Sequence, residues 1–209
     1  MKSRQGGQAG RSEKRRYTQR ARAEAVGRTT RRIAAAAAEL HATIGPAATT
    51  ISAVAERAGV PRVTVYRHFP DEESLFQACQ AHYLDQHPPP QPHWTDVGDA
   101  QERTRAALSA LYRYFDETED MTANLLRDAP RVPVLRDILS GMHDFLDWLR
   151  DDLATAWQRR PATKLRAIAG HAVSFTTWRS LCVEGSLGER EAVDLMIVLL
   201  RHVASRDDT

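Results

Sequence analysis

The sequence contains few cysteines and no long hydrophobic run. Its 209 residues include only Cys79 and Cys182, too few for a disulfide framework, which favours a reducing compartment. No apolar segment approaches the roughly 18 residues that a membrane-spanning helix needs, so no membrane partner is expected. The N-terminal segment lacks the hydrophobic region of a secretory signal. We therefore expect a cytoplasmic protein.

Motifs of catalysis and of metal binding are also missing from the sequence. It has no phosphate-binding glycine loop, no nucleophile elbow and no closely spaced pair of cysteines. His82, His87 and His93 flank a proline-rich segment, but their spacing is not that of metal ligands on a helix. We expect no catalytic residues, no metal and no cofactor. A helical enzyme that uses a C-terminal cavity is only a remote alternative.

Charge is distributed unevenly along the chain, although the net charge is only +2. Residues 1–27 carry eight basic and two acidic side chains, whereas residues 28–87 carry equal numbers of each sign. Residues 88–209 carry 15 basic and 19 acidic side chains. A basic N-terminal segment before a mildly acidic body suggests a polyanionic partner, most simply nucleic acid.

Composition divides the chain into four segments. Residues 1–28 are rich in Gly, Gln, Ser and Arg and contain few large apolar side chains, so they are expected to form a basic, disordered arm. Residues 29–86 have a helical pattern. Residues 87–93 contain four prolines, which are typical of a semi-rigid linker. Residues 94–209 are again helical in pattern.

The apolar periodicity predicts an all-α protein of about nine helices. No segment shows the alternating pattern of a strand. Ile33, Ala37, Leu40 and Ile44 share one face of a first helix that starts near Thr29. The other predicted helices are Ile51–Ala58, Pro61–His68, Glu72–Leu84, Ala100–Glu117, Met121–Arg127, Val134–Gln158, Ala162–Glu184 and Glu189–Ser205.

The segment from Ile51 to His68 has the spacing of a helix-turn-helix. Ala55 is small where two helices would cross, and Gly59 occupies the turn, where a positive φ is needed. Val65 can then pack the second helix against the first. An ordinary helical hairpin is the alternative interpretation of these three residues alone.

The run from Thr64 to Pro70, TVYRHFP, resembles the end of the recognition helix in the TetR (tetracycline repressor) family of bacterial regulators. Residues 29–80 match the N-terminal module of that family in order and spacing. The resemblance implies a homodimer that binds palindromic operator DNA and is released by a small-molecule inducer. An activator, or a regulator without an inducer, is the alternative.

The resemblance also implies which side chains meet DNA. Arg62 is the best candidate to read a base, because its guanidinium can pair bidentately with guanine. Three residues of the second helix match the phosphate contacts of the family, and the arm could add further contacts or be a passive tail. The candidates are Thr50, Ser52, Arg62, Val63, Thr64, Tyr66, Arg67, His68, Arg15, Arg16 and Arg20.

Two positions depart from the family pattern. Glu72 stands where the family usually has a basic residue near the DNA backbone, and Asp71 and Glu73 flank it. Because carboxylates repel phosphates, that contact is not expected here. Pro61 and Val63 replace a hydroxyl cap and a common glycine, so the resemblance does not predict the operator sequence.

The resemblance assigns the C-terminal helices to dimerisation and ligand binding. The last helix is apolar on more than one side, because Leu195 and Leu199 lie away from its main stripe. The dimerisation candidates are Leu165, Ile168, Ala172, Val193, Met196, Ile197, Leu200 and Val203. An ordinary core residue is the alternative interpretation of each ligand candidate. The candidates are Tyr112, Phe115, Asn124, Met142, His143, Phe145, Trp148, His171, Phe175 and Trp178.

Overall fold

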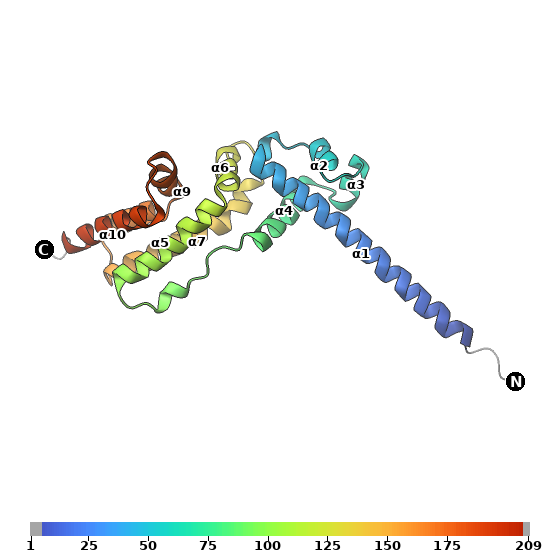
Figure 1. Cartoon of the computed structure of the whole chain (residues 1–209), viewed down its shortest axis with the longest axis horizontal. Coiled ribbons are helices and arrows are strands. Elements are labelled where there is room, and N and C mark those ends of the chain that lie inside the picture. Colours follow the sequence, from blue (N-terminus) through green and yellow to red (C-terminus); the bar gives the residue numbers. More distant parts are fainter. Residues whose placement is uncertain (1–5, 207–209) are drawn as a thin grey trace. The chain divides into compact units, whose positions relative to one another are not determined.

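The computed structural model describes residues 6–206, without the side chains of residues 6–16 and 18. Within that range the chain forms ten α-helices and no strand, which confirms the all-α prediction (Figure 1). The chain divides into two compact units, residues 1–83 and 84–209. None of the described helices is both long enough and apolar enough to cross a membrane.

The first unit contains a long helix and three short or medium ones. These are α1 (Gly6–Thr43), α2 (Ile51–Arg57), α3 (Arg62–His68) and α4 (Glu72–Gln86), with a 3-10 turn at Pro46–Ala48. The α2 helix begins where predicted, because the Thr50 hydroxyl accepts a hydrogen bond from the Ala53 amide at 3.1 Å. The unit boundary falls inside α4, close to the predicted linker.

The α1 helix is longer than predicted and replaces the expected disordered arm over residues 6–28. Alanine and arginine in this segment have high helix propensity, and the Arg20 Nε donates to Glu24 Oε1 at 3.0 Å one turn away. The composition therefore supports a helix that continues the folded part of α1. Tyr17 and Val26 on this extension are exposed.

The core of the first unit lies where α1, α2, α3 and α4 meet. Ile33 and Ala37 of α1, Val54 of α2 and Val65 of α3 are all fully buried, and α2 packs against both α1 and α3. Together they close the angle between the two short helices. The small side chain of Ala55 is buried as well, as a close helix crossing requires.

Polar atoms in this core are also paired. The His41 and Phe76 rings stack with centroids 4.7 Å apart, and the Cys79 sulfur lies 3.4 Å from His41 Nδ1. Burial raises the pKa of the Cys79 thiol to about 12. This cluster fixes α4 against α1.

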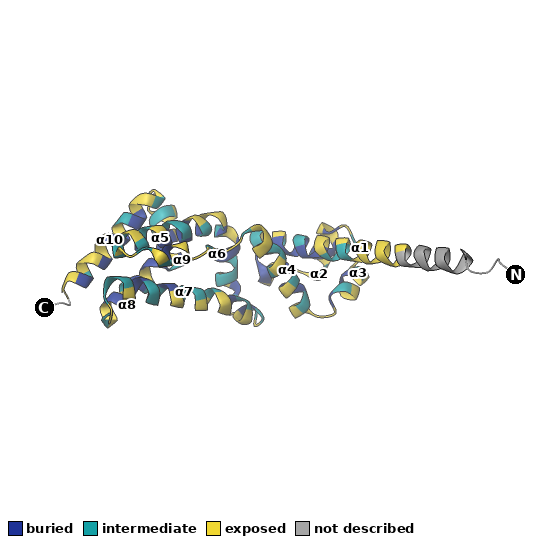
Figure 2. Cartoon of the chain, turned by 90° about the horizontal axis from the view of Figure 1, so that it is seen from below, coloured by how far each residue is buried: buried dark blue, intermediate teal, exposed yellow. Residues whose placement is uncertain are grey.

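The second unit packs five longer helices around an aromatic core. Its elements are α5 (Ala100–Glu117), α6 (Glu119–Asp128), α7 (Leu135–Trp157), α8 (Thr163–Ala172), α9 (Phe175–Trp178) and α10 (Glu189–Arg206), with a 3-10 turn at His93–Asp96 and a π-helical turn at Arg179–Glu184. The α5 helix packs on α7 and α10, and α8 packs on α7 and α10. Buried positions face inward on each helix (Figure 2).

The predicted helix Ala162–Glu184 is broken into α8, α9 and the π-helical turn. Ser174 causes the break, because its side chain accepts from the Thr176 amide and contacts the Thr176 hydroxyl at 2.7 Å. Local hydroxyl bonds of this kind compete with the regular helical ladder. Tyr112 stabilises the junction from α5 by donating to the Ala172 carbonyl at 2.9 Å.

Candidate nucleic-acid interface

The turn between α2 and α3 has the geometry of a helix-turn-helix. Gly59 has a φ of 62°, the left-handed conformation that glycine adopts at little cost. Its amide donates to the Glu56 carbonyl at 3.0 Å, and the Val60 amide donates to Ala55 at 2.9 Å. The positive φ predicted for Gly59 is therefore confirmed.

The α3 helix is buried on one side and exposed on the other. Val65 is fully buried, whereas Val63 is 73% exposed and Tyr66 is 49% exposed. Arg62 and Arg67 are also exposed on this helix, and Thr64 is half-buried. Large apolar side chains open to solvent beside arginines are typical of a surface that contacts another molecule. Arg62 lies one turn before Tyr66, with Nη2 3.5 Å from the Tyr66 hydroxyl.

One ring nitrogen of His68 is engaged in a hydrogen bond within the first unit. Its Nδ1 lies 3.0 Å from the Thr30 hydroxyl, and that hydroxyl donates to the Val26 carbonyl at 3.1 Å. This contact engages Nδ1, so only an N–H at Nε2 could donate to a phosphate. This bond ties the end of α3 to α1, a role that sequence reasoning missed.

The supporting helix presents two hydroxyl residues at its start. Thr50 and Ser52 are both exposed. The Thr50 oxygen already caps α2, so its remaining capacity is the hydroxyl proton. The structure thus places both predicted residues on the surface at one end of α2.

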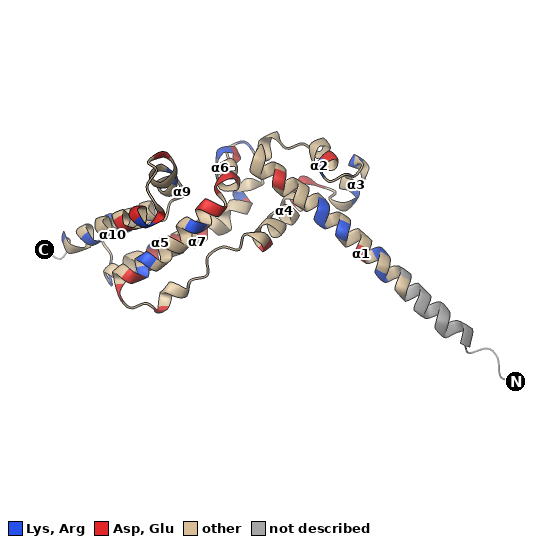
Figure 3. Ribbon diagram, viewed as in Figure 1, with Lys and Arg blue, Asp and Glu red and all other residues tan. Residues whose placement is uncertain are grey.

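Basic residues on α1 add to this surface. Figure 3 shows basic positions recurring along the described part of α1 and on α3. Arg28, Arg31 and Arg32 are exposed, and Arg32 Nη2 donates to the Gly59 carbonyl at 3.4 Å in the helix-turn-helix turn. These three exposed arginines were not among the predicted DNA-binding candidates, although a charge count along the predicted first helix could have identified them.

Of the three arm residues predicted to meet DNA, Arg20 is exposed and paired with Glu24. The side chains of Arg15 and Arg16 lie outside the described part of the chain. Their proposed contacts with DNA therefore remain predictions.

The acidic residues at the start of α4 stabilise this end of the helix. The Asp71 carboxylate accepts from the Ser74 amide at 2.8 Å and thereby caps the helix. This bond and the Ser74 hydroxyl hold the pKa of Asp71 below its usual value. Glu72 and Glu73 follow in the first turn, where the helix dipole favours negative charge.

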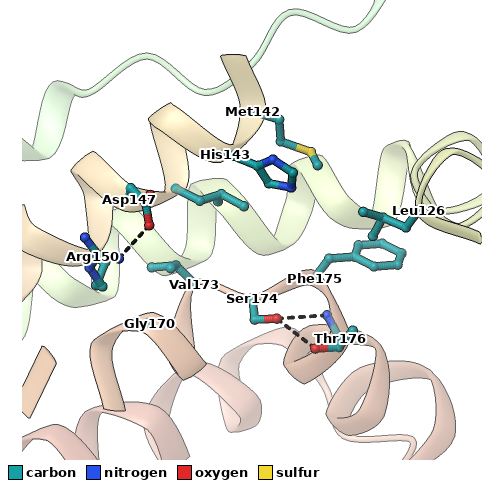
Figure 4. A pocket seen from close by; sticks show the side chains of 11 residues that line it. Leu126, Met142, His143, Asp147, Arg150, Gly170, Val173, Ser174, Phe175 and Thr176 are labelled. Carbon is teal, nitrogen blue, oxygen red and sulfur yellow. Dashed lines mark hydrogen bonds and ion pairs between the residues drawn. The ribbon is translucent and has the colours of Figure 1, made fainter. Parts of the chain in front are cut away.

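A pocket of about 460 Å³ lies in the second unit between α6, α7 and the α8–α9 bend (Figure 4). Of the ten predicted ligand residues, Met142, His143 and Phe175 line it. Sequence reasoning missed four polar lining residues, Asp147, Arg150, Ser174 and Thr176. A helix pattern cannot distinguish a polar residue that faces a cavity from one that faces solvent.

The other seven ligand candidates do not line this pocket. Tyr112, Phe115 and Trp178 are buried in the aromatic core, where Phe115 and Trp178 have ring centroids 5.9 Å apart. The remaining four are partly or fully exposed and engaged elsewhere. Asn124 bonds Arg127, His171 bonds Thr177, and Phe145 contacts Trp148.

Most of the predicted dimerisation residues are buried within the chain itself. Only Ile168 and Val203 are half-buried, and the other six are core residues with 3% exposure or less. A side chain already covered by its own core cannot form a second interface, so these assignments are corrected. The apolar side chains of α10 that remain exposed are Leu195, Val198 and Leu199.

Within the described residues, no group of three or more His, Cys, Asp or Glu side chains is arranged to hold a metal ion. Cys79 and Cys182 are both free thiols.

Comparison with known proteins agrees with this geometry. Residues 33–79 match the family model of bacterial regulatory proteins of the tetR family. No curated protein matches the sequence. The matched range covers the end of α1, the helix-turn-helix and the first half of α4.

Several solved structures share the fold. A protein from Clostridium perfringens, described as a fatty acid metabolism regulator, has a TM-score of 0.58 and 13% identity, over 82% of this chain and 97% of that chain. A TetR-family transcriptional regulator from Rhodococcus sp. has a TM-score of 0.56 and 18% identity, over 84% and 98%. A multidrug binding protein, EbrR, complexed with imidazole, has a TM-score of 0.52 and 21% identity, over 81% and 93%.

The family match covers the residues that build the exposed α3 surface, and the shared fold covers both units. Residues 33–79, which include the helix-turn-helix, therefore match bacterial regulatory proteins of the tetR family, and the whole chain shares the fold of the solved structures.

Proposed function

We propose that this protein is a repressor that binds palindromic operator DNA as a homodimer and leaves it when a small molecule binds the second unit. The observation that supports this most is the exposed α3 surface, with Arg62, Val63 and Tyr66 set on a helix whose other side is buried. A helix-turn-helix inserts such a surface into the major groove. Because its DNA partner is cytoplasmic, we propose that the protein acts there.

Within that surface we assign different tasks to different residues. Arg62, near the start of α3, reads a base, and Val63 contacts a thymine methyl. Thr64, Tyr66 and His68 bind phosphates, and Arg67 reaches a base or a phosphate. Thr50 and Ser52 bind the backbone from the start of α2. Arg15, Arg16 and Arg20 of α1 add phosphate contacts that strengthen binding without selecting sequence.

Dimerisation is proposed to use the exposed side of α10. Leu195, Val198 and Leu199 form an apolar row there, between 36% and 47% exposed. Burying that row against the same row of a second copy would remove apolar surface from water. The resulting two-fold symmetric dimer would carry two α3 surfaces, one for each half of a palindrome. The half-buried Ile168 and Val203 could extend this interface.

Release from DNA is proposed to start at the pocket of the second unit. A ligand there would favour a conformation of the second unit that binds DNA poorly, because a ligand shifts an equilibrium only toward the state it binds better. The α4 helix spans the boundary between the units along the chain, so we assign it the transmission of that shift. EbrR, a protein of the same fold, is a multidrug binding protein.

Selection of DNA sites from a random pool with the purified full chain tests this function. We expect enrichment of a palindrome with two half-sites about one helical turn apart, and a complex with two chains per site. Enrichment of single half-sites, or a complex of one chain per site, would contradict the dimeric repressor. A reporter gene placed behind the selected site then separates repression from activation.

A further inference from the structure

The pocket of the second unit has two polar ends and an apolar wall. One end is on α7 and carries His143, Asp147 and Arg150, as Figure 4 shows. The other end is the hydroxyl pair of Ser174 and Thr176 at the α8–α9 bend. The wall between them consists of Leu126, Met142, Leu146, Val173 and Phe175. A volume of about 460 Å³ is in the range of small-molecule sites.

The guanidinium in the pocket is already engaged by two carboxylates. Arg150 Nη1 donates to Asp147 Oδ1 at 2.5 Å, and Nε and Nη2 donate to the two oxygens of Asp151, each at 3.1 Å. These contacts raise the pKa of Arg150, with the hydrogen bond to Asp151 as the largest cause. An anionic ligand would have to compete with both carboxylates for this guanidinium.

The shape of α8 helps to hold Arg150 in place. A Cβ atom added at Gly170 would lie 3.3 Å from Arg150 Cδ, so the glycine leaves room for the arginine stem on α8. The aliphatic part of the Arg150 side chain is thus confined between α7 and α8, and its guanidinium donates hydrogen bonds to Asp151. Arg150 therefore shares its one positive charge between Asp147 and Asp151 and does not present an open cation.

The Asp147 carboxylate is more accessible to a ligand than the Arg150 guanidinium is. Its side chain is 66% exposed, and the described residues donate hydrogen bonds to its Oδ1 but none to its Oδ2. The exposed His143 lies one turn earlier on the same helix and also lines the pocket. This end therefore offers a carboxylate oxygen and an imidazole beside an apolar wall that includes Phe175 and the Met142 thioether.

We infer that this pocket binds an amphipathic amine, with its ammonium group at Asp147 and its apolar body against Phe175, Met142 and Leu146. The inference rests on the proposed ligand-responsive function and specifies the chemical class of the ligand. A carboxylate close to an apolar wall favours a ligand that combines a positive charge with an aromatic or aliphatic body.

Three probes of equal size and different charge test this inference. Phenylbutylamine, phenylbutanol and phenylbutanoate are titrated into the full chain at neutral pH by isothermal calorimetry. We expect the amine to bind roughly ten-fold more tightly than the alcohol, with the carboxylate weakest, as expected for a charge-assisted contact. Equal affinities, a preference for the carboxylate, or no binding of the amine at millimolar concentration would each overturn the assignment.

Two substitutions on α7 test whether Asp147 causes the tighter binding of the amine. Asp147→Asn should reduce amine affinity about five-fold and leave that for the alcohol unchanged, because it removes one partly exposed charge. Asp144→Asn, at another exposed carboxylate on the same helix that does not line the pocket, is the matched control and should leave both affinities unchanged. Equal loss in both variants would mean that only the general field of α7 attracts the amine.

Failure of this inference can be told apart from failure of the regulatory function. DNA-site selection is performed on the same protein without any probe. Selective DNA binding without amine binding would reject only the ligand class. Amine binding with no enriched DNA sequence would reject the regulatory function and leave the pocket assignment standing.

Discussion

At the scale of single residues, the α3 surface combines a weakly bonded side chain with one that the fold holds in place. Arg62 is exposed, and within the described residues its side chain makes only a weak 3.5 Å hydrogen bond to Tyr66, so its guanidinium can turn toward a base. His68, by contrast, is fixed by Thr30. An exposed, weakly bonded charged side chain suits a contact with a base, and a fixed side chain suits a contact that sets register.

Replacing Arg62 with alanine should lower affinity for the selected site by about 1–3 kcal/mol and relax its sequence preference at one position, because a bidentate base contact is lost. Fluorescence anisotropy with the selected site and with single-base variants measures both effects. Arg136→Ala, an exposed arginine in the second unit, is the control. An unchanged preference would remove Arg62 as a base reader.

The two thiols should differ in reactivity. Burial raises the pKa of Cys79 to about 12, and the pKa of the less buried Cys182 is raised mainly by partial burial. Because the thiolate is the reactive form, a higher pKa leaves less of it at a given pH. At pH about 8, a thiol reagent should modify Cys182 first and Cys79 only on unfolding. Reactivity of Cys79 should rise as pH approaches its raised pKa; rapid labelling of both thiols at pH about 8 would contradict the described burial.

At the scale of helices, the sequence predicted the backbone structure correctly wherever that structure depends on neighbouring residues. Gly59 requires a positive φ, Thr50 caps α2, and Ala55 and Val65 pack the motif, so the helix-turn-helix follows from residues close together in the chain. The break between α8 and α9 depends on a local hydrogen bond between the Ser174 and Thr176 hydroxyls. The apolar periodicity of the sequence does not reveal such a bond. The inward and outward sides of α10 depend on α5 and α8, which pack against it from distant parts of the sequence.

The exposed row on α10 should control the oligomeric state. Leu199→Glu places a charge in an apolar interface, which is costly without a partner, so the variant should be monomeric at micromolar concentration. Light scattering coupled to size-exclusion chromatography measures the mass. Ile44→Glu, at an exposed apolar position of the first unit, is the control and should leave the mass unchanged. A dimeric Leu199→Glu variant would exclude this row as the interface.

The basic part of α1 should affect the salt dependence of DNA binding. Deleting residues 1–16 removes six of the basic side chains and one acidic one. If they neutralise phosphates, the plot of log K against log salt should become less steep by about 0.9 for each lost contact. Anisotropy titrations over a range of salt concentrations measure the slope. An identical slope would make this segment a passive extension.

At the scale of the whole molecule, DNA and ligand should oppose each other by the same factor. Binding linkage requires that, if the ligand weakens DNA binding several-fold, the selected operator weakens ligand binding equally. Calorimetry of the proposed amine with and without saturating operator measures this factor. A scrambled duplex of equal length is the control. Equal ligand affinities in both states would mean that the pocket is not coupled to DNA binding.

The hydrogen bond between Thr30 and His68 has a consequence for the entropy of association. It joins α3 to α1 in the free protein, and Val65 anchors the same short helix in the core. A seven-residue helix would be unstable alone, so its order is a product of folding and not of contact with DNA. The conformational entropy of the recognition helix is therefore largely lost before any operator is met, and the affinity for DNA is not reduced by that loss.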